Sequence, residues 1–315
     1  MKRQDPDERS KDARTTGDRG TALSVRARLA LGMIIFGSAT PVSKIVAAAA
    51  PVFVGALFRV ALGALVLAPF AIRKRKAMTE LAGGDWFRIA LISLFGMFGF
   101  TAAMLYGMQM VSGVVGAAVM STTPAVTGLA AMIFLRESPT WRKFAALVLA
   151  VVGVLILHLG RTGEQGAGGN ALLGIALVFT AVCCEAIYTL LGKRMSERSD
   201  PILVAWLAAI LSIPIFLPFA VWQWDGPQFG LQGWLAILWY GAGTLALGSW
   251  LWYSGIARAE GSIAAGFMGL MPVSALVLSY VLLDEAFRWR DLIGFATVFA
   301  GVLLMSWEHA RKASE

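Results

Sequence analysis

Long apolar stretches alternate with short polar segments along almost the whole chain. Each stretch holds about 20 residues, the length that a helix rising about 1.5 Å per residue needs to cross a bilayer core roughly 30 Å thick. Buried helices of soluble proteins need only about 10 to 14 apolar residues, so these stretches predict transmembrane helices. Ten stretches qualify: residues 28–47, 52–72, 87–108, 113–134, 141–160, 171–192, 202–222, 232–254, 262–283 and 287–307. The predicted fold class is therefore an all-α integral membrane protein with ten transmembrane helices.

Composition and charge agree with a membrane protein. Of the 315 residues, 58% are hydrophobic and 15% are charged, whereas about 25% are charged in a typical soluble domain. The net charge of +8 would suggest a nucleic-acid partner in a soluble protein. Here most of the 27 Lys and Arg residues fall in the N-terminal tail and in the segments that alternation of ten spans places on the same side. The positive-inside rule then predicts cytoplasmic N- and C-termini, a lipid bilayer around the chain and no nucleic-acid partner.

One segment of the sequence occurs twice. Residues 120–141, MSTTPAVTGLAAMIFLRESPTW, align with residues 268–289, MGLMPVSALVLSYVLLDEAFRW. Apolar matches arise easily by chance, but Pro, Glu, Trp and Arg recurring in one register indicate a duplication. Because each copy has five spans, the second copy must enter the membrane from the opposite side, which gives the inverted-topology repeat of secondary transporters.

This duplication divides the chain into five parts. The predicted parts are a disordered basic cytoplasmic tail (1–26), the first repeat with helices 1–5 (27–160), a periplasmic linker (161–170), the second repeat with helices 6–10 (171–307) and a cytoplasmic tail (308–315).

The repeated motif resembles the EamA domain of the drug/metabolite transporter superfamily. The resemblance lies in a midspan Pro, a Glu at the end of that span, a Trp-bearing turn, and the segments FGSATPVSK (36–44) and PVFVGALFRVALGALVLAPF (51–70). It covers about residues 28–307 in two copies. It implies a multi-pass transporter of the bacterial inner (plasma) membrane that exports amino acids or other small metabolites without ATP hydrolysis, so no cofactor is expected.

Glu185 is the most informative single residue. It lies inside the sixth span, where a carboxylate costs roughly 2.5 to 3.5 kcal/mol, and no basic residue stands three or four positions away. Low dielectric favours the protonated carboxyl group. The stretch EAIYTLLGK (185–193) also resembles the first helix of the small multidrug resistance proteins, in which the corresponding Glu binds protons and cationic substrate in competition. The resemblance implies a proton-coupling or amine-binding role for Glu185; pairing with a cation from another helix is the alternative.

Two cations, Lys44 and Arg59, stand beyond the first four residues of the predicted spans. Arg59 stands seven residues into the second span, and its partner in the other repeat is about Ala209, so the shared fold does not need an arginine there. Arg59 is expected either to bind an anionic group such as a carboxylate or to extend to the membrane surface. Lys44 is a weaker site candidate, because it stands near the end of the first span, where a snorkelling or helix-end cation is typical.

Two prolines stand near the middle of their spans. Pro124 and Pro272 each remove a backbone donor and free a carbonyl group, which is expected either to kink the helix beside a central cavity or to serve packing alone. Thr122 and Thr123 are expected to bond the backbone or a substrate. Glu137 and Glu285, at the ends of these spans, are expected to anchor or cap the next helix.

Aromatic residues supply the last candidates. They concentrate in spans 8 and 9, as Trp239, Tyr240, Trp250, Trp252, Tyr253 and Tyr280. Some are expected to form the belt at the membrane surface. Trp250, Tyr253 and, in the sixth span, Tyr188 are candidates to line a cavity for aromatic or cationic groups.

Other functions receive less support from the sequence. No Walker A, H-E-x-x-H or G-x-S-x-G motif occurs, so an enzyme is disfavoured. An antiporter of phosphorylated sugars or nucleotide sugars would need several cations in the spans, and a multidrug-like cation carrier is the other alternative. The prediction is a carrier that binds a small-molecule substrate between spans 1–4 and 6–9 and works by alternating access. Spans 5 and 10 are expected to act as a scaffold or to form a homodimer.

Overall fold

A computed structural model describes residues 6–134, 141–161, 170–196, 199–226, 229–256, 258 and 267–312. All regular elements in these residues are helices: α1 (Pro6–Ala49), α2 (Val52–Ile72), α3 (Arg75–Thr79), α4 (Gly83–Leu91), the π-helix η1 (Ile92–Gly99), α5 (Phe100–Met110), α6 (Gly113–Met120), α7 (Thr123–Phe134), α8 (Trp141–Arg161), α9 (Ala171–Ser196), α10 (Pro201–Trp222), α11 (Leu231–Leu238), the π-helix η2 (Trp239–Gly248), α12 (Ser249–Ile256), α14 (Leu270–Leu283) and α15 (Trp289–Lys312).

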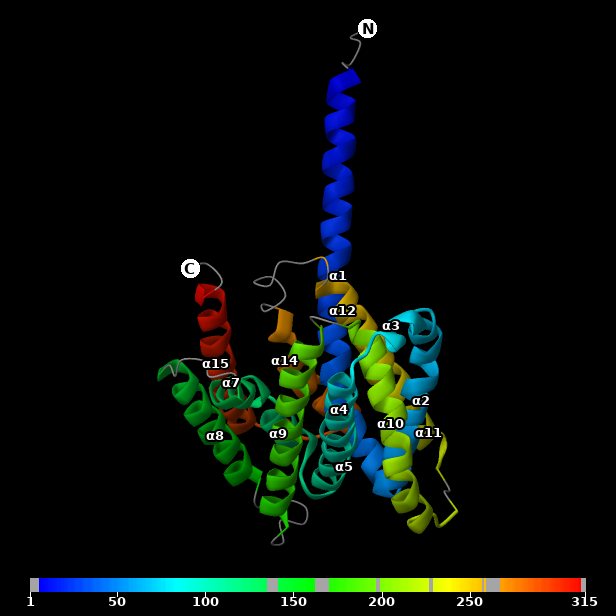
Figure 1. Cartoon of the computed structure of the whole chain (residues 1–315). Coiled ribbons are helices and arrows are strands. Elements are labelled where there is room, and N and C mark those ends of the chain that lie inside the picture. The colour runs from blue at the N-terminus through cyan, green and yellow to red at the C-terminus, as the bar shows by residue number, and fades with distance from the viewer. Residues whose placement is uncertain are drawn as a thin grey trace.

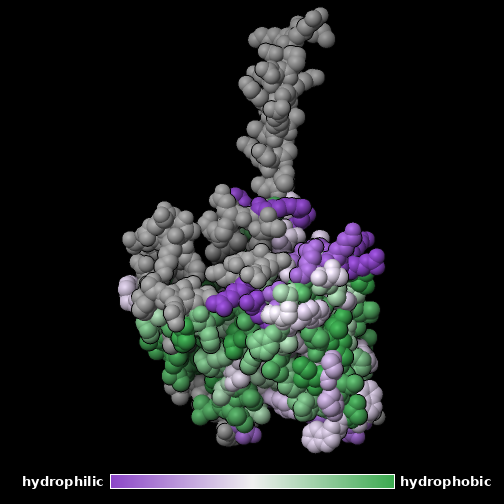
Figure 2. Space-filling view, viewed as in Figure 1, coloured by the Kyte–Doolittle hydropathy of each residue, from purple (hydrophilic) through white to green (hydrophobic). Residues whose placement is uncertain are grey.

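The helices are long and apolar enough for a membrane protein. Seven segments of the described chain meet the length and hydropathy of a span: Ser24–Ala49, Val52–Ile72, Gly83–Met110, Gly113–Phe134, Ala171–Gly192, Pro201–Trp222 and Leu231–Gly255. Shorter apolar helices at Phe144–Leu157 and Leu270–Leu283, together with α15, occupy the other three predicted spans. The outer surface in Figure 2 is apolar across the middle and polar toward the end that carries the N-terminus. The predicted fold class, an all-α membrane protein, is confirmed.

Helix packing follows the two halves of the chain. Helix α2 packs on α10 and α8 packs on α15, so each of these helices contacts its own counterpart. Helix α1 packs on α14, and its counterpart α9 packs on α6 and α7; α9 also packs on α5, as α1 does on α12. In Figure 1, α1 runs down through the bundle and α9 runs up, while α15 ends at the same end of the bundle as the N-terminus. This is the arrangement that an inverted repeat requires.

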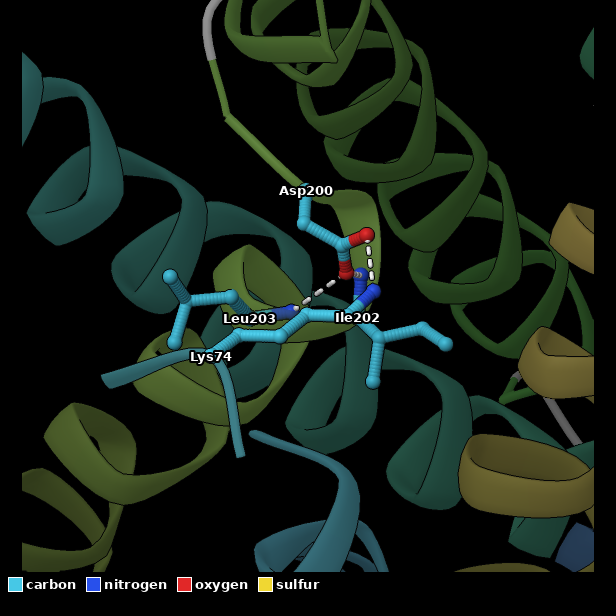
Figure 3. A network of polar contacts seen from close by, with 4 residues as sticks. All are labelled: Lys74, Asp200, Ile202 and Leu203. Carbon is cyan, nitrogen blue, oxygen red and sulfur yellow. Dashed lines mark hydrogen bonds and ion pairs between the residues drawn. The ribbon is translucent and has the colours of Figure 1, made fainter. Parts of the chain in front are cut away.

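An ion pair joins the halves near the end of the bundle that holds the termini. The ammonium group of Lys74, after α2, pairs with the carboxylate of Asp200, which also accepts hydrogen bonds from the backbone N–H groups of Ile202 (3.0 Å) and Leu203 (3.3 Å) (Figure 3). Asp200 is thus the N-cap of α10. One carboxylate therefore starts α10 and ties it to the first repeat.

The terminal segments differ from the prediction. Helix α1 begins at Pro6 and α15 ends at Lys312, so most of the segment 1–26 continues α1 instead of forming a disordered tail, and part of the tail 308–315 continues α15. Adding residues to an existing helix avoids the cost of nucleation, and Pro is well tolerated at a first helical position. The segments 1–5 and 313–315, most of the linker 161–170, and Glu137 lie outside the described residues.

The two halves deviate from α-helical geometry at equivalent places. The third and eighth spans contain η1 and η2, and π-helical segments often mark functional sites. The fourth span is interrupted by a turn at Ser121 and Thr122 just before Pro124, and a turn at Gly269 precedes Pro272. Both prolines stand within the first turn of the helix that follows, where a missing N–H is tolerated. The duplication is therefore visible in the local helix geometry as well as in the sequence.

Candidate functional site

Glu185 and Thr123 meet where the two halves of the chain face each other. Glu185 lies on α9 and Thr123 begins α7, and the Thr123 Oγ1 atom is 3.0 Å from the Glu185 Oε2 atom and 2.7 Å from the Met120 carbonyl oxygen. A hydroxyl group carries one hydrogen, so it cannot donate fully to both oxygens. A protonated Glu185 resolves the competition, because the carboxyl group then donates to Thr123 while Thr123 donates to Met120. The arrangement can thus hold a proton.

The face of α9 that carries Glu185 is accessible toward the C-terminal end of this helix. Glu185 and Tyr188 are half-buried and Thr189 is exposed, and a β-carbon placed on Gly192 would meet no atom within 4 Å. Thr180 is exposed too, but it stands nine residues before Thr189, on the opposite side of an α-helix. Glu185 therefore lies on a different side of α9 from Thr180, and the accessible positions that follow it lie toward the end of the bundle that holds both termini (Figure 1).

Tyrosines surround this carboxyl group. Tyr188 of α9 and Tyr253 of α12 interact electrostatically. Glu185 interacts electrostatically with Tyr188 and with Tyr240 of η2. Two of the aromatic residues expected at a cavity, Tyr188 and Tyr253, thus lie with Glu185.

Arg59 is buried, so the expectation that it extends to the membrane surface is wrong. It is 7% exposed, and its Nη1 group donates a hydrogen bond to the hydroxyl group of Thr101, on α5. The guanidinium carbon lies 4.3 Å from the ring centroid of Tyr240 and 5.6 Å from that of Phe100. Arg59 also interacts electrostatically with Glu185. The structure therefore places a cation and a carboxyl group in one aromatic environment.

Lys44 lies apart from this group, as a helix-end cation. Its ammonium group donates to the carbonyl oxygens of Met108 (3.0 Å) and Val111 (2.5 Å), at the C-terminal end of α5. A cation there satisfies free carbonyl groups and the helix dipole. This contact accounts for a cation near the end of the first span.

Glu285 caps a helix other than the expected one. Its carboxylate accepts hydrogen bonds from the N–H groups of Gly113 and of Val114 (3.3 Å), in the first turn of α6, and it interacts electrostatically with Lys44. The expectation was that Glu285 anchors its span at the membrane surface or caps the helix that follows, whereas the helix that it caps here belongs to the first repeat. Together Glu285 and Lys44 hold the turn between α5 and α6 at the end of the bundle opposite to the termini.

The remaining candidates have local partners. Thr122 donates to the carbonyl oxygen of Val119 (2.7 Å) and is buried, so it stabilises its own turn. The ring of Trp250 lies 5.9 Å from the guanidinium carbon of Arg28, near the start of the membrane part of α1. Neither residue has a described contact with Glu185.

Three site residues were not identified from the sequence. Thr101 and Phe100 stand at the start of α5, and Tyr240 was only one of six aromatic residues in spans 8 and 9. Each meets Arg59 from another helix, so no spacing in the chain reveals the contact. A π-helical signature in η1 and η2 could have pointed to Phe100 and Tyr240, but sequence periodicity does not show π-helices.

Comparisons with known proteins agree with this architecture. The profile of the EamA-like transporter family matches residues 28–159 and 172–307. A Bacillus subtilis protein named uncharacterized transporter YetK is 30% identical over 279 residues, which cover 88% of this chain and 84% of that protein. A Streptantibioticus cattleyicolor protein named probable terminal-alkyne amino-acid exporter is 24% identical over 249 residues, 77% of this chain and 78% of that protein. A solved crystal structure has the same fold, with a TM-score of 0.65 at 15% identity over 91% of this chain and 98% of that one.

Proposed function

The chain belongs to the EamA-like transporter family and is a multi-pass membrane transporter, not an enzyme, and we propose that it exports amino acids or related small metabolites from bacteria. In this proposal it lies in the inner membrane with both termini in the cytoplasm, works by alternating access, and couples export to proton entry at Glu185. The contact between Glu185 and Thr123 carries the proposal. The similarity to a protein named as an amino-acid exporter supports the substrate class.

The position of that contact fits a coupling role. Thr123 belongs to the first half and Glu185 to the second, so relative motion of the halves changes their separation. A carboxyl group that gives up its proton to bind an amine also loses the hydrogen-bond arrangement with Thr123 described above. The protonation state of Glu185 would thereby favour one arrangement of the halves over the other, which is what coupling requires.

Contacts between the halves support a conformation closed at the end opposite to the termini. There the Gln223 side chain accepts a hydrogen bond from the Phe53 N–H group (2.9 Å) and donates one to the Tyr106 hydroxyl (3.0 Å). Glu285 and Gly113 add a second link. The accessible positions that follow Glu185 on its face of α9, Thr189 and Gly192, lie toward the other end. With cytoplasmic termini, this conformation would receive substrate from the cytoplasm.

Two other classes of substrate are candidates for a carrier of the same superfamily. Phosphorylated sugars would need several cations at the site, but Lys44 is occupied with backbone carbonyl groups. Among the other described cations of spans 1–4, Arg28 and Arg88 stand at the starts of their spans, which leaves Arg59 in the interior. Efflux of organic cations is the second candidate function, because Glu185 with Tyr188 and Tyr253 offers a carboxylate and aromatic rings. The buried positive charge of Arg59 argues against efflux of organic cations.

Purified protein in liposomes tests the proposal. We expect saturable counterflow of labelled amino acids and a flux that responds to an imposed pH gradient. Glu185→Gln should keep or reduce counterflow but abolish the response to the gradient, whereas Glu80→Gln, at an exposed acidic residue, should behave as wild type. Thr123→Val should weaken the response, and Thr123→Ser should restore it. An undiminished gradient response in Glu185→Gln would refute coupling at this residue.

A further inference from the structure

The pair formed by Arg59 and Tyr240 has unused hydrogen-bond donors in the buried interior of the bundle. The guanidinium group has five N–H donors; the described contact uses Nη1, and the buried Nε atom has no partner among the described residues. The hydroxyl group of Tyr240, a fully buried residue, also has no partner in the described part of the chain. Buried polar groups without partners are rare in folded proteins, and here two of them lie on side chains that touch each other.

The pair also breaks the symmetry of the fold. Helix α2 packs on η2 and, equivalently, α10 packs on η1. At the position equivalent to Arg59 stands Ala209, which is fully buried. The scaffold thus has a small apolar residue in the other copy of the contact. A packing role explains Ala209, but it does not explain a cation at Arg59.

Among the described residues, no carboxylate forms an ion pair with Arg59; the pairs of Lys74 with Asp200 and of Arg88 with Asp85 do not involve it. Glu185 is close enough to interact with both Arg59 and Tyr240 electrostatically, yet it bonds to Thr123. A cation and a carboxyl group are therefore held apart across an aromatic environment of Tyr188, Tyr240 and Phe100.

We propose that Arg59 and Tyr240 form the subsite for the carboxylate of a zwitterionic substrate, whose ammonium group binds at Glu185. The substrate carboxylate accepts hydrogen bonds from the Arg59 Nε–H group and from the Tyr240 hydroxyl, and the planar guanidinium group suits a carboxylate better than a Lys ammonium does. A substrate with both charges satisfies both ends at once, and a neutral or purely cationic one leaves Arg59 without a partner. This inference rests on the proposed carrier function and narrows its substrate class to α-amino acids.

The test compares three forms of one molecule in proteoliposomes. Exchange of each of the twenty labelled protein amino acids is measured first. For phenylalanine, chosen for the aromatic surroundings, and for the amino acid with the fastest exchange, the free acid, its amide and its decarboxylated amine are then used as competitors. We expect the wild-type protein to favour the free acid at least tenfold over the amide and the amine. Arg59→Lys should reduce this preference at least tenfold, and Tyr240→Phe should reduce it about threefold to tenfold.

The preference separates binding from a structural role. Loss of folding or of general activity in Arg59→Lys would lower transport of the acid and the amide alike, whereas loss of a carboxylate subsite lowers only that of the acid. Leu65→Ala, on the same helix at a side chain that is 69% exposed, should keep the wild-type preference. Because Tyr240→Phe changes one oxygen atom, it tests the subsite even if Arg59→Lys does not fold.

The outcomes also separate this inference from the carrier function. Equal competition by acid and amide, or no exchange of any amino acid alongside saturable exchange of the cation tetraphenylphosphonium that depends on Glu185, would overturn the carboxylate subsite and leave a carrier. Folded protein that exchanges none of these probes would overturn the proposed function together with this inference. An unchanged preference in both Arg59→Lys and Tyr240→Phe would overturn the inference alone.

Discussion

The ring of Tyr188 lies directly against Gly96, so that a β-carbon placed on Gly96 would stand 2.9 Å from the Tyr188 Cβ and Cγ atoms. Gly96 belongs to η1 and Tyr188 to α9, one turn after Glu185. The π-helical segment and its glycine therefore bring the third span close enough to α9 to support the ring that lies beside the proposed coupling residue.

Gly96→Ala should disturb this support. The added methyl group must displace the Tyr188 ring or the backbone of η1, and overpacking of this kind costs about 1 to 3 kcal/mol. We expect a lower free energy of unfolding in detergent micelles and at least tenfold slower exchange in proteoliposomes. Gly84→Ala, in the same span, is the matched control, because a β-carbon there would meet no atom within 4 Å. Equal effects of the two substitutions would show that Gly96 has no special contact.

Glu285→Ala should destabilise the turn between α5 and α6. The substitution removes the acceptor for the N–H groups of Gly113 and Val114, and loss of a helix cap typically costs about 0.5 to 2 kcal/mol. Denaturant titration in micelles should show this loss, with a smaller one for Glu285→Gln, which keeps one acceptor oxygen. A change within about 0.5 kcal/mol, as is usual at unconstrained surface positions, would mean that the cap does not stabilise the fold.

Substitutions of Asp200 can separate the stabilisation that comes from the helix cap from the stabilisation that comes from the ion pair (Figure 3). Asp200→Asn keeps an oxygen for the N–H groups of Ile202 and Leu203 but removes the attraction to Lys74. Since the Lys74 and Asp200 side chains are 43% and 30% exposed, this pair should contribute less than about 1 kcal/mol. Asp200→Ala should cost about 1 kcal/mol more, through loss of the cap. Lys74→Ala should match Asp200→Asn, and a larger effect of Asp200→Asn than of Asp200→Ala would contradict this division.

The sequence predicts the scaffold well because hydrophobicity and local motifs determine it. Run lengths of apolar residues give the spans, and the register of Pro124 with Pro272 gives the duplication. The composition of the segment 1–26 predicts disorder, but α1 continues through most of this segment, because helix propagation from a stable span favours order.

The site is predictable only in part, because its contacts join distant segments. Glu185 is recognisable by its cost in the membrane, and the structure gives it a partner, Thr123, that was itself a candidate. The partners of Arg59 come from α5 and η2, and Glu285 caps a helix 172 residues away, since nothing in a single segment specifies which helix will lie beside it. The duplication is a reason to look for contacts between the two halves, but three-dimensional packing determines which residues meet.

Crosslinking of Tyr106 and Gln223 tests alternating access. Their side chains are hydrogen-bonded across the two halves at the end of the bundle that is closed in this conformation. If the halves must separate there to release substrate, a covalent link between cysteines at these positions should stop exchange.

The double variant is made after Cys183 and Cys184 are replaced by alanine. Its exchange is measured before and after a reducible bifunctional thiol reagent is added. We expect exchange to fall at least tenfold and to return on reduction. The matched control links Ala47 to Gln109, which are hydrogen-bonded within the first half (2.9 Å), and should leave exchange unchanged. Full exchange in the linked Tyr106 and Gln223 variant would contradict movement of the two halves at this end.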